Sequence, residues 1–180
     1  LKTREGEGKA DDQTVWVQPP GTPSVGLALL DAYKATGDQF YLDLAKQAGH
    51  CLVRGQLRSG GWDYRIVFNK KARASYAYLV DAPVEGKKQQ NTSTLDDNVT
   101  QAAIRLLMAL DETLKQSDPA IHQAAMTGLE TLLEVQYPIG AWPQRFTGPP
   151  DPDKYPVLKA SYPESWSREF PKVDYKDYYT

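Results

Sequence analysis

The segment Gln56-Leu57-Arg58-Ser59-Gly60-Gly61-Trp62 has a similar counterpart 80 residues later, Gln136-Tyr137-Pro138-Ile139-Gly140-Ala141-Trp142. The segments ahead of the two copies also match, with Val25–Leu30 corresponding to Ala102–Leu107. Each unit is therefore predicted to be a helix, a short turn, a second helix and a tryptophan loop. Such hairpins are typical of arrays and toroids, in which each unit buries its apolar face on its neighbours. We expect an all-α fold, an (α/α) toroid that is incomplete here, because two units are fewer than such arrays usually need.

Four helices are predicted from apolar spacing and from their end signals. Thr22-Pro23 suits a first turn and Gly37 a helix end, so one helix is expected between them. Asp38 is expected to cap a second helix that extends to Val53, and the short link makes these two antiparallel. Two further helices are expected over 99–114 and 119–133, with Asp118 as the cap of the last one.

The chain is expected to be one partial toroid domain over residues 1–180. Its first repeat spans about 22–65 and its second about 94–145, with a long loop over 66–93 and a segment rich in proline and tyrosine over 146–180. Strand-like runs at Tyr64–Phe68 and Ser75–Val80 flank Asn69–Arg73, which suggests a small β-hairpin. Lys70, Lys71 and Arg73 are expected to form its solvated tip.

Composition excludes several classes of protein. The 180 residues carry 21 Lys and Arg against 23 Asp and Glu, a net charge of -2, so we expect no nucleic acid partner. The apolar runs are short, as at Leu27–Leu30, and no membrane span is expected. We expect a monomer.

One cysteine and two histidines limit the metal chemistry. Cys51 has no disulfide partner within the chain, and His50 and His122 fall inside predicted helices, where we expect structural or solvent-facing roles. A metal site would therefore consist mainly of oxygen ligands, which favours calcium or magnesium.

The cluster Thr94-Leu95-Asp96-Asp97-Asn98-Val99-Thr100-Gln101 has two interpretations. Thr94 or Asp96 could cap the following helix, where acidic side chains suit the positive end of the helix dipole. Two carboxylates and an amide are more oxygen than a cap needs, so the cluster could instead supply part of a calcium shell or hold a basic substrate-binding side chain. Both interpretations stay open.

The tryptophan loops also have two interpretations. Trp62 and Trp142 could fill the end of a helical barrel, with glycines permitting tight turns. Alternatively, they could be flat platforms for sugar rings, with Arg65 and Arg145 positioned to pair with carboxylates.

Three segments resemble the family 10 pectate lyases, the pectic acid lyases. Thr94–Thr100 resembles the family's T-I-D-N-x-A-T motif, and Gln136–Gln144 resembles its Q…GGWPQ segment. Tyr175–Thr180 is similar to the stretch that leads into its T-F-N-D motif. The resemblance covers most of the chain in the right order.

This resemblance implies a toroid of three helical hairpins, a Ca²⁺ cofactor and β-elimination of polygalacturonate or a related acidic polysaccharide. It also implies a bacterial protein that is secreted or periplasmic. The family's catalytic arginine and a second metal aspartate belong to the region after Thr180, so we expect this chain to be catalytically incomplete.

Asp96 matches the aspartate of the motif and is expected at the calcium and substrate site, with a catalytic and a metal-binding role. Asp97 replaces the family's asparagine and is expected to support the metal. The predicted substrate-binding residues are Trp62, Arg65, Asn98, Trp142, Gln144 and Arg145. Two alternatives are a non-catalytic carbohydrate-binding toroid and a toroid glycoside hydrolase, for which Asp63 and Asp96 would be the carboxylate pair to test.

Overall fold

The structure is a computed structural model that describes residues 3–4, 8–9, 11–151, 153 and 164–165. The chain divides into two units, residues 1–150 and 151–180. The first unit contains every helix and strand described below. Most of the expected proline- and tyrosine-rich segment and the whole of Tyr175–Thr180 lie outside the described residues.

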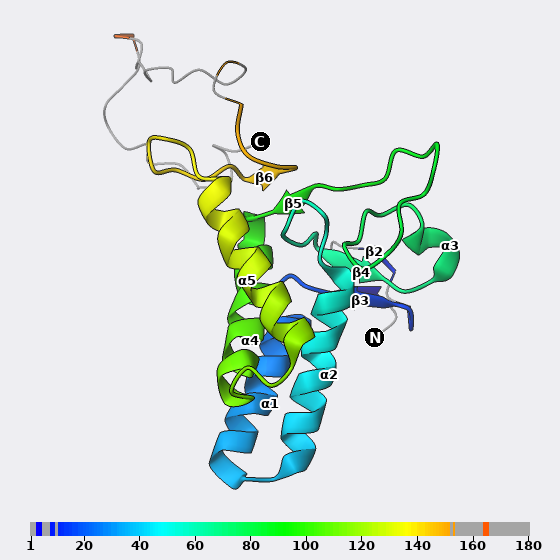
Figure 1. Cartoon of the computed structure of the whole chain (residues 1–180), viewed down its shortest axis with the longest axis vertical. Helices are drawn as coiled ribbons and strands as arrows, with labels where there is room; N and C mark the ends of the chain where they lie inside the picture. The colour runs from blue at the N-terminus through cyan, green and yellow to red at the C-terminus, as the bar shows by residue number, and fades with distance from the viewer. Residues whose placement is uncertain (1–2, 5–7, 10, 152, 154–163, 166–180) are drawn as a thin grey trace. The chain divides into compact units, whose positions relative to one another are not determined.

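Two helical hairpins form the body of the first unit (Figure 1). The elements in chain order are β1 (Thr3–Arg4), β2 (Gly8–Lys9), β3 (Thr14–Trp16), α1 (Thr22–Thr36), α2 (Gln39–Gly55), β4 (Arg65–Val67), α3 (Lys70–Arg73), β5 (Ser93–Thr94), the 3-10 helix η1 (Asp96–Asn98), α4 (Val99–Thr113), α5 (Pro119–Glu134) and β6 (Arg145–Phe146).

The expected end signals set the limits of these helices. Gly37 ends α1 with a left-handed φ of 72°, and its N–H donates to the Tyr33 carbonyl. Asp38 caps α2 by accepting a hydrogen bond from the Phe40 N–H, and Asp118 caps α5 in the same way from Ile121. The four predicted long helices are thus confirmed.

The second hairpin packs on the first mainly through α4, which contacts both α1 and α2. Eight residues of α4 are buried, more than in any other described helix, because both of the first hairpin's helices cover it. Largest among the fully buried side chains of the described residues are Trp62, Tyr78, Leu30, Leu52, Leu57, Ile66, Leu106, Leu107, Leu110 and Ile121.

The sequence repeat is present as a repeated set of hydrogen bonds. In each tryptophan loop, a glutamine side-chain amide donates to the glycine carbonyl four residues later. Gln56 Nε2 lies 2.8 Å from the Gly60 carbonyl oxygen, and Gln136 Nε2 lies 2.9 Å from that of Gly140. The glutamine thus closes both loops into the same turn.

The two tryptophans are also anchored identically. The Trp62 indole N–H donates to the Leu52 carbonyl at 2.8 Å, and the Trp142 indole N–H donates to the Leu132 carbonyl at 2.8 Å. Each ring is therefore bound to the last turns of the helix that precedes its loop.

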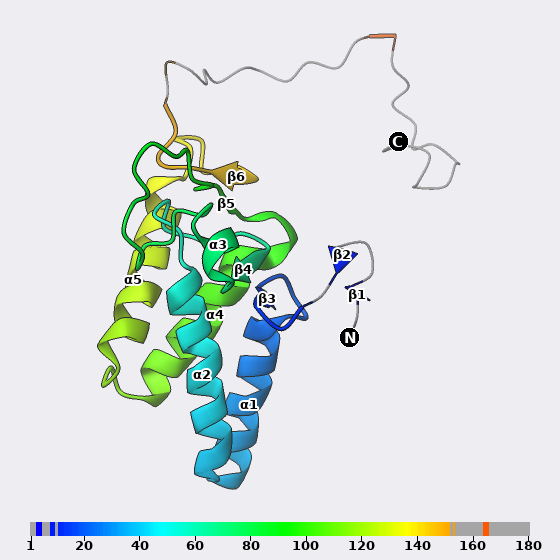
Figure 2. The same cartoon turned by 90° about the vertical axis from the view of Figure 1, so that its right-hand side faces the viewer.

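A short two-stranded sheet closes each hairpin at the same end. β3 pairs antiparallel with β4, and β5 with β6, so Trp16 lies opposite Arg65 and Thr94 lies opposite Arg145. Figures 1 and 2 show β3, β4, β5 and β6 at the end of the helices away from the α1–α2 turn. Segments far apart in the sequence meet there.

The predicted β-hairpin over 64–80 is wrong. β4 pairs with β3 from the N-terminal side, and residues 70–73 form the short helix α3 in place of a strand turn. Lys70 and Lys71 are exposed as expected, but Arg73 is not a solvated tip. Its guanidinium pairs with Asp81 at 2.6 Å and donates to the Arg54 carbonyl.

The all-α class is confirmed in outline, with three short two-stranded sheets added. Two hairpins side by side do not make a ring, so the toroid stays a prediction. Within the described part of the chain, no helix has the length and apolar character to cross a membrane.

The paired glycines Gly60 and Gly140 give a matched test of repeat packing. Both have positive φ, 95° and 84°, so alanine strains each loop by roughly 1–2 kcal/mol. A Cβ on Gly60 would lie 1.8 Å from Thr131 Oγ1, whereas a Cβ on Gly140 meets only Gln136 Nε2 at 4.0 Å. We expect G60A to lose roughly 1–3 kcal/mol more than G140A in denaturant unfolding. Equal losses would contradict the packing of the first loop against α5.

Candidate functional site

The carboxylate of Asp96 lies where the two tryptophan loops meet. Its Oδ2 accepts a hydrogen bond from the Tyr64 hydroxyl at 3.0 Å and another from Gln144 Nε2. Its Oδ1 accepts from the Asp97 backbone N–H at 3.0 Å. These donors, Gln144 first and then Tyr64, lower the pKa of Asp96 below its ordinary value, because they favour the charged form. Asp96 is therefore held as an anion.

The backbone around Asp96 is fixed by the second loop. The Leu95 N–H donates to the Gln144 carbonyl at 2.8 Å, and the Thr94 hydroxyl donates to the same oxygen at 3.2 Å. The Thr94 hydroxyl in turn accepts from the Asp96 N–H at 3.1 Å. The short β5–β6 sheet thus fixes the position from which the Asp96 side chain projects.

Of the two caps expected, Asp96 does not cap α4, whereas the Thr94 hydroxyl accepts from the Asp96 N–H at the start of η1. Asn98 stands at the cap position of α4, but neither its side chain nor those of Asp96 and Asp97 cap the helix. Asp97 and Asn98 instead have left-handed φ values of 49° and 62°. Such strain costs of order 1–3 kcal/mol per residue and gathers at functional sites. The turn directs the Asp96 carboxylate toward the tryptophan loops.

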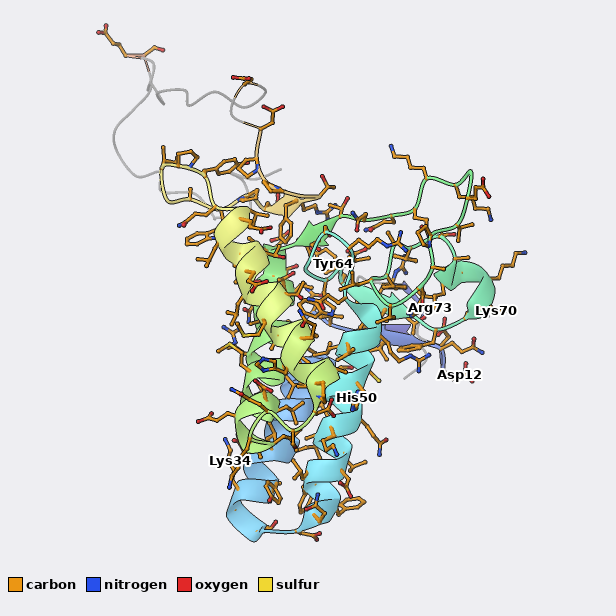
Figure 3. All side chains as sticks on the ribbon, viewed as in Figure 1. Asp12, Lys34, His50, Tyr64, Lys70 and Arg73 are labelled. Atoms are coloured by element: carbon orange, nitrogen blue, oxygen red, sulfur yellow. The ribbon has the colours of Figure 1, made fainter. Side chains whose placement is uncertain are left out.

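Tyr64 is a site residue that sequence reasoning did not select. It stands 80 residues before Gln144, so the two residues hold equivalent positions in the repeat. That equivalence is the sequence signal that could have identified Tyr64. Partial burial, followed by its hydrogen bond to Asp96, raises the pKa of Tyr64. Figure 3 shows Tyr64 among the loops at the sheet end of the helices. The Arg145 guanidinium lies 5.9 Å from its ring centroid and adds a cation beside the cluster.

Asp97 and Asn98 are held by other partners. Gln18 Nε2 donates to Asp97 Oδ2 at 3.0 Å, and the Arg105 guanidinium donates to Asn98 Oδ1. Both residues are exposed. The structure therefore brings Asp96 together with Tyr64, Gln144 and Arg145, whereas Asp97 and Asn98 form separate contacts beside it.

A hollow of about 560 Å³ borders Asp96 on one side. Leu95, Gln101, Leu132, Trp142, Pro143 and Gln144 complete its lining. The Trp142 side chain is 49% exposed, and the Gln101 Oε1 atom is buried without a described hydrogen-bond partner. The hollow is thus apolar toward Trp142 and polar toward Asp96.

The predicted sugar-binding role of Trp62 is wrong. Its ring has no exposed surface, and its N–H is bonded to the Leu52 carbonyl, so no face is left for a sugar. The second hairpin covers it. Arg65 and Arg145, in contrast, are both exposed on β4 and β6, 80 residues apart in equivalent positions of the two repeats.

The two histidines lie away from this cluster, as expected. His50 on α2 pairs with Asp118 at 2.9 Å, and His122 on α5 pairs with Asp111 at 2.8 Å. In Figure 3, His50 lies on α2, away from Tyr64 and the loops around it. Both pairs tie helices of the body together.

The described residues supply only part of a calcium shell. Calcium takes six to eight oxygen ligands. Within the described ranges, no group of three or more His, Cys, Asp or Glu side chains is arranged to hold a metal ion. Asp96 and Asp97 are adjacent, but their carboxylates accept hydrogen bonds from different donors. These residues alone do not fit a complete calcium site.

The pKa of Asp96 tests this geometry. Gln144→Ala and Tyr64→Phe each remove a donor to the carboxylate, so each should raise that pKa toward 3.8, with the larger change for Gln144. The stabilisation from this pairing is present above the ordinary pKa and is lost as the pH falls through the lowered value. The measurement is an NMR titration of the Asp96 carboxyl carbon. Gln136→Ala removes an equivalent amide that does not touch Asp96 and serves as the control; no change in either test variant would disprove the cluster.

Comparison with known proteins agrees with the motifs that surround Asp96. The family model described as pectic acid lyase matches residues 68–158, which contain both Asp96 and Gln144. No curated protein and no solved structure was found to match the chain. Because the matched region covers just over half of the 180 residues, the chain belongs to the pectic acid lyase family.

Proposed function

We propose that this chain binds polygalacturonate, or a related acidic polysaccharide, as part of a lyase that cleaves it by calcium-dependent β-elimination. One observation carries the proposal. The Asp96 carboxylate, which lies within the matched region, accepts three hydrogen bonds that favour its ionised form, and the exposed Arg145 lies beside it. We further propose that it acts outside the cytoplasm, where such polymers occur.

Charge supports the need for a cation at this site. A uronate carboxylate placed beside an ionised Asp96 would be repelled by it, because the two charges have the same sign. A cation between the two carboxylates turns this repulsion into attraction. We propose calcium for this role, with Asp96 as one ligand, Asp97 beside it and the substrate supplying further oxygens.

β-Elimination removes the proton next to the uronate carboxylate and expels the oxygen of the glycosidic bond. Negative charge grows on the uronate as the proton leaves, so cations close to it lower the barrier. When bound, calcium would neutralise that carboxylate. Arg145 and Arg65 are proposed to pair with uronate groups along the polymer, since a guanidinium binds a carboxylate through two parallel hydrogen bonds. Gln144 and Asn98 are proposed to orient hydroxyl groups of the sugar.

A glycoside hydrolase has less support. Such an enzyme needs one carboxyl group with a raised pKa as its general acid, whereas the pKa of Asp96 is lowered. Asp63 accepts hydrogen bonds from the Tyr64 N–H and from Gln90 Nε2. A non-catalytic polysaccharide-binding protein is the second candidate, because the cluster around Asp96 can bind without eliminating.

The affinity for trigalacturonate, measured by calorimetry with calcium or with a chelator, tests the proposed function. Loss of a charge-assisted contact corresponds to roughly 10- to 100-fold in affinity, so Asp96→Ala should weaken calcium-dependent binding by that factor. Asp31→Ala removes an exposed carboxylate from α1 and is the charge-matched control. Equal affinity in the Asp96 variant and the wild type would contradict the assignment.

Elimination is assayed on a protein lengthened at its C-terminus by a third repeat, from the ultraviolet absorbance of the unsaturated product of polygalacturonate. A rise that needs calcium and is lost in Asp96→Ala is the expected result. A flat trace from folded protein that still binds trigalacturonate would favour the binding protein over the lyase.

A further inference from the structure

Gln101, on the first turn of α4, lines the hollow beside Asp96 and has an unusual set of hydrogen bonds. Its Nε2 atom donates to the Leu95 carbonyl at 2.9 Å. Its Oε1 atom is buried and has no hydrogen-bond partner among the described residues. A buried acceptor without a partner lowers the folding equilibrium constant by roughly 5- to 150-fold, so the placement of this amide needs a physical reason.

A glutamine at this position normally stabilises the start of a helix. Gln101 is the third residue of α4, and Asn98 stands at the cap position. In a capping box, the side-chain oxygen of a glutamine at the third position accepts the N–H of the cap residue. Gln101 instead reaches past Asn98 to Leu95 with its amide nitrogen, which leaves the oxygen unpaired. Its hydrogen bond therefore holds the segment before the helix and does not cap the helix.

The hydrogen bond from Gln101 replaces one that a longer helix would make. If α4 continued backward by one turn, the Leu95 carbonyl would accept the N–H of Val99, four residues later. The Val99 N–H donates instead to the Asp96 carbonyl, and the two residues between Asp96 and Val99 have left-handed φ values of 49° and 62°. The Gln101 amide thus supplies a donor to the carbonyl that the left-handed turn deprives of its helical partner.

The peptide group that leads into Asp96 is fixed at both of its polar atoms. Gln101 holds its carbonyl, which belongs to Leu95, and the Thr94 hydroxyl accepts its N–H, which belongs to Asp96, at 3.1 Å. The Thr94 hydroxyl is itself held by the Gln144 carbonyl. Because rotation of this peptide group would swing the Asp96 side chain, Gln101 acts on the carboxylate through the backbone.

We propose that Gln101 is a positioning residue, which keeps the turn after Asp96 left-handed and so directs the carboxylate to Tyr64 and Gln144. Two features that lower stability, the unpaired Oε1 atom and the left-handed turn, then have one origin, because both follow from directing Asp96 away from a helix cap. The consequence for polymer binding rests on the proposed function, whereas the effect on the turn does not.

Stability separates this role from a purely structural one. Methionine has nearly the length of glutamine but no amide, so Gln101→Met removes both the hydrogen bond to Leu95 and the unpaired acceptor. The bond is worth roughly 2- to 13-fold in the folding equilibrium constant, no more than the unpaired acceptor takes away. In denaturant unfolding, Gln101→Met should therefore be within about threefold of the wild-type equilibrium constant, or more stable. A purely structural residue would give a clear loss.

NMR reports the turn directly, through the NOE between the amide and α protons within Asp97 and within Asn98. These two protons lie closer together at positive φ than in a helix, so the wild type should give strong cross-peaks for both residues. In Gln101→Met both cross-peaks should weaken to the level of ordinary helical residues. Gln123→Met, which removes an exposed glutamine that hydrogen-bonds within α5, is the control and should leave them strong.

Gln101→Lys is the rescue variant. A lysine ammonium can donate to the Leu95 carbonyl but has no acceptor atom, so this variant keeps the donor and removes the unpaired oxygen. Both cross-peaks should stay strong in it. Their loss in Gln101→Lys as well as in Gln101→Met would contradict the role given to the donor.

Calorimetry with trigalacturonate and calcium measures the consequence for binding. A turn that is relaxed in about nine-tenths of the molecules weakens the apparent affinity about tenfold, which is the loss expected for Gln101→Met, with none for Gln123→Met. Strong cross-peaks that persist in Gln101→Met, or a Gln101→Met protein that is unfolded, would overturn the proposal. A wild type that binds no trigalacturonate would refute the proposed function alone, because the cross-peaks test the turn without it.

Discussion

Burial of the Trp62 loop by the second hairpin is the contact on which the rest of the structure depends. The indole N–H and the loop backbone find partners in α2, β5 and α4, so a large ring is enclosed without leaving polar groups unpaired. Gln56 joins the same loop to α5. Because the loop contacts both helices and the segment before them, the second hairpin has one orientation on the first.

This packing also positions the acidic residue of the site. The segment that carries Ser93 and Thr94 against the first loop continues directly into Asp96, where the left-handed turn at Asp97 directs the carboxylate to Tyr64 and Gln144. Tyr64 and Gln144 occupy equivalent places in the two loops, so one anion is held jointly by both repeats. A negative charge fixed at this point would repel an anionic polymer unless positive charge lies beside it. Arg145 supplies part of that positive charge.

Much of the fold is readable from the sequence because local signals and the repeat agree. Asp38 and Asp118 cap the second helix of each hairpin, and the recurrence of Gln56 at Gln136 marks the loops. The pairing of β4 with β3 could not be predicted, since the partner strand lies far away along the chain and is only three residues long. The motif identified Asp96, but spacing alone could not show that a left-handed turn replaces the helix cap. Nor could it show that Trp62, unlike Trp142, is covered by a neighbouring hairpin.

The central claim is that a uronate polymer binds at the carboxylate shared by the two loops. Chemical shifts of the Asp97 backbone amide and the Gln144 side-chain amide, followed by NMR as trigalacturonate is added in the presence of calcium, test it most directly. Both signals should move with the same concentration dependence, while the Gly37 amide at the α1–α2 turn stays unchanged. Shifts confined to the Ala141 and Trp142 amides, with Asp97 and Gln144 unmoved, would contradict the account.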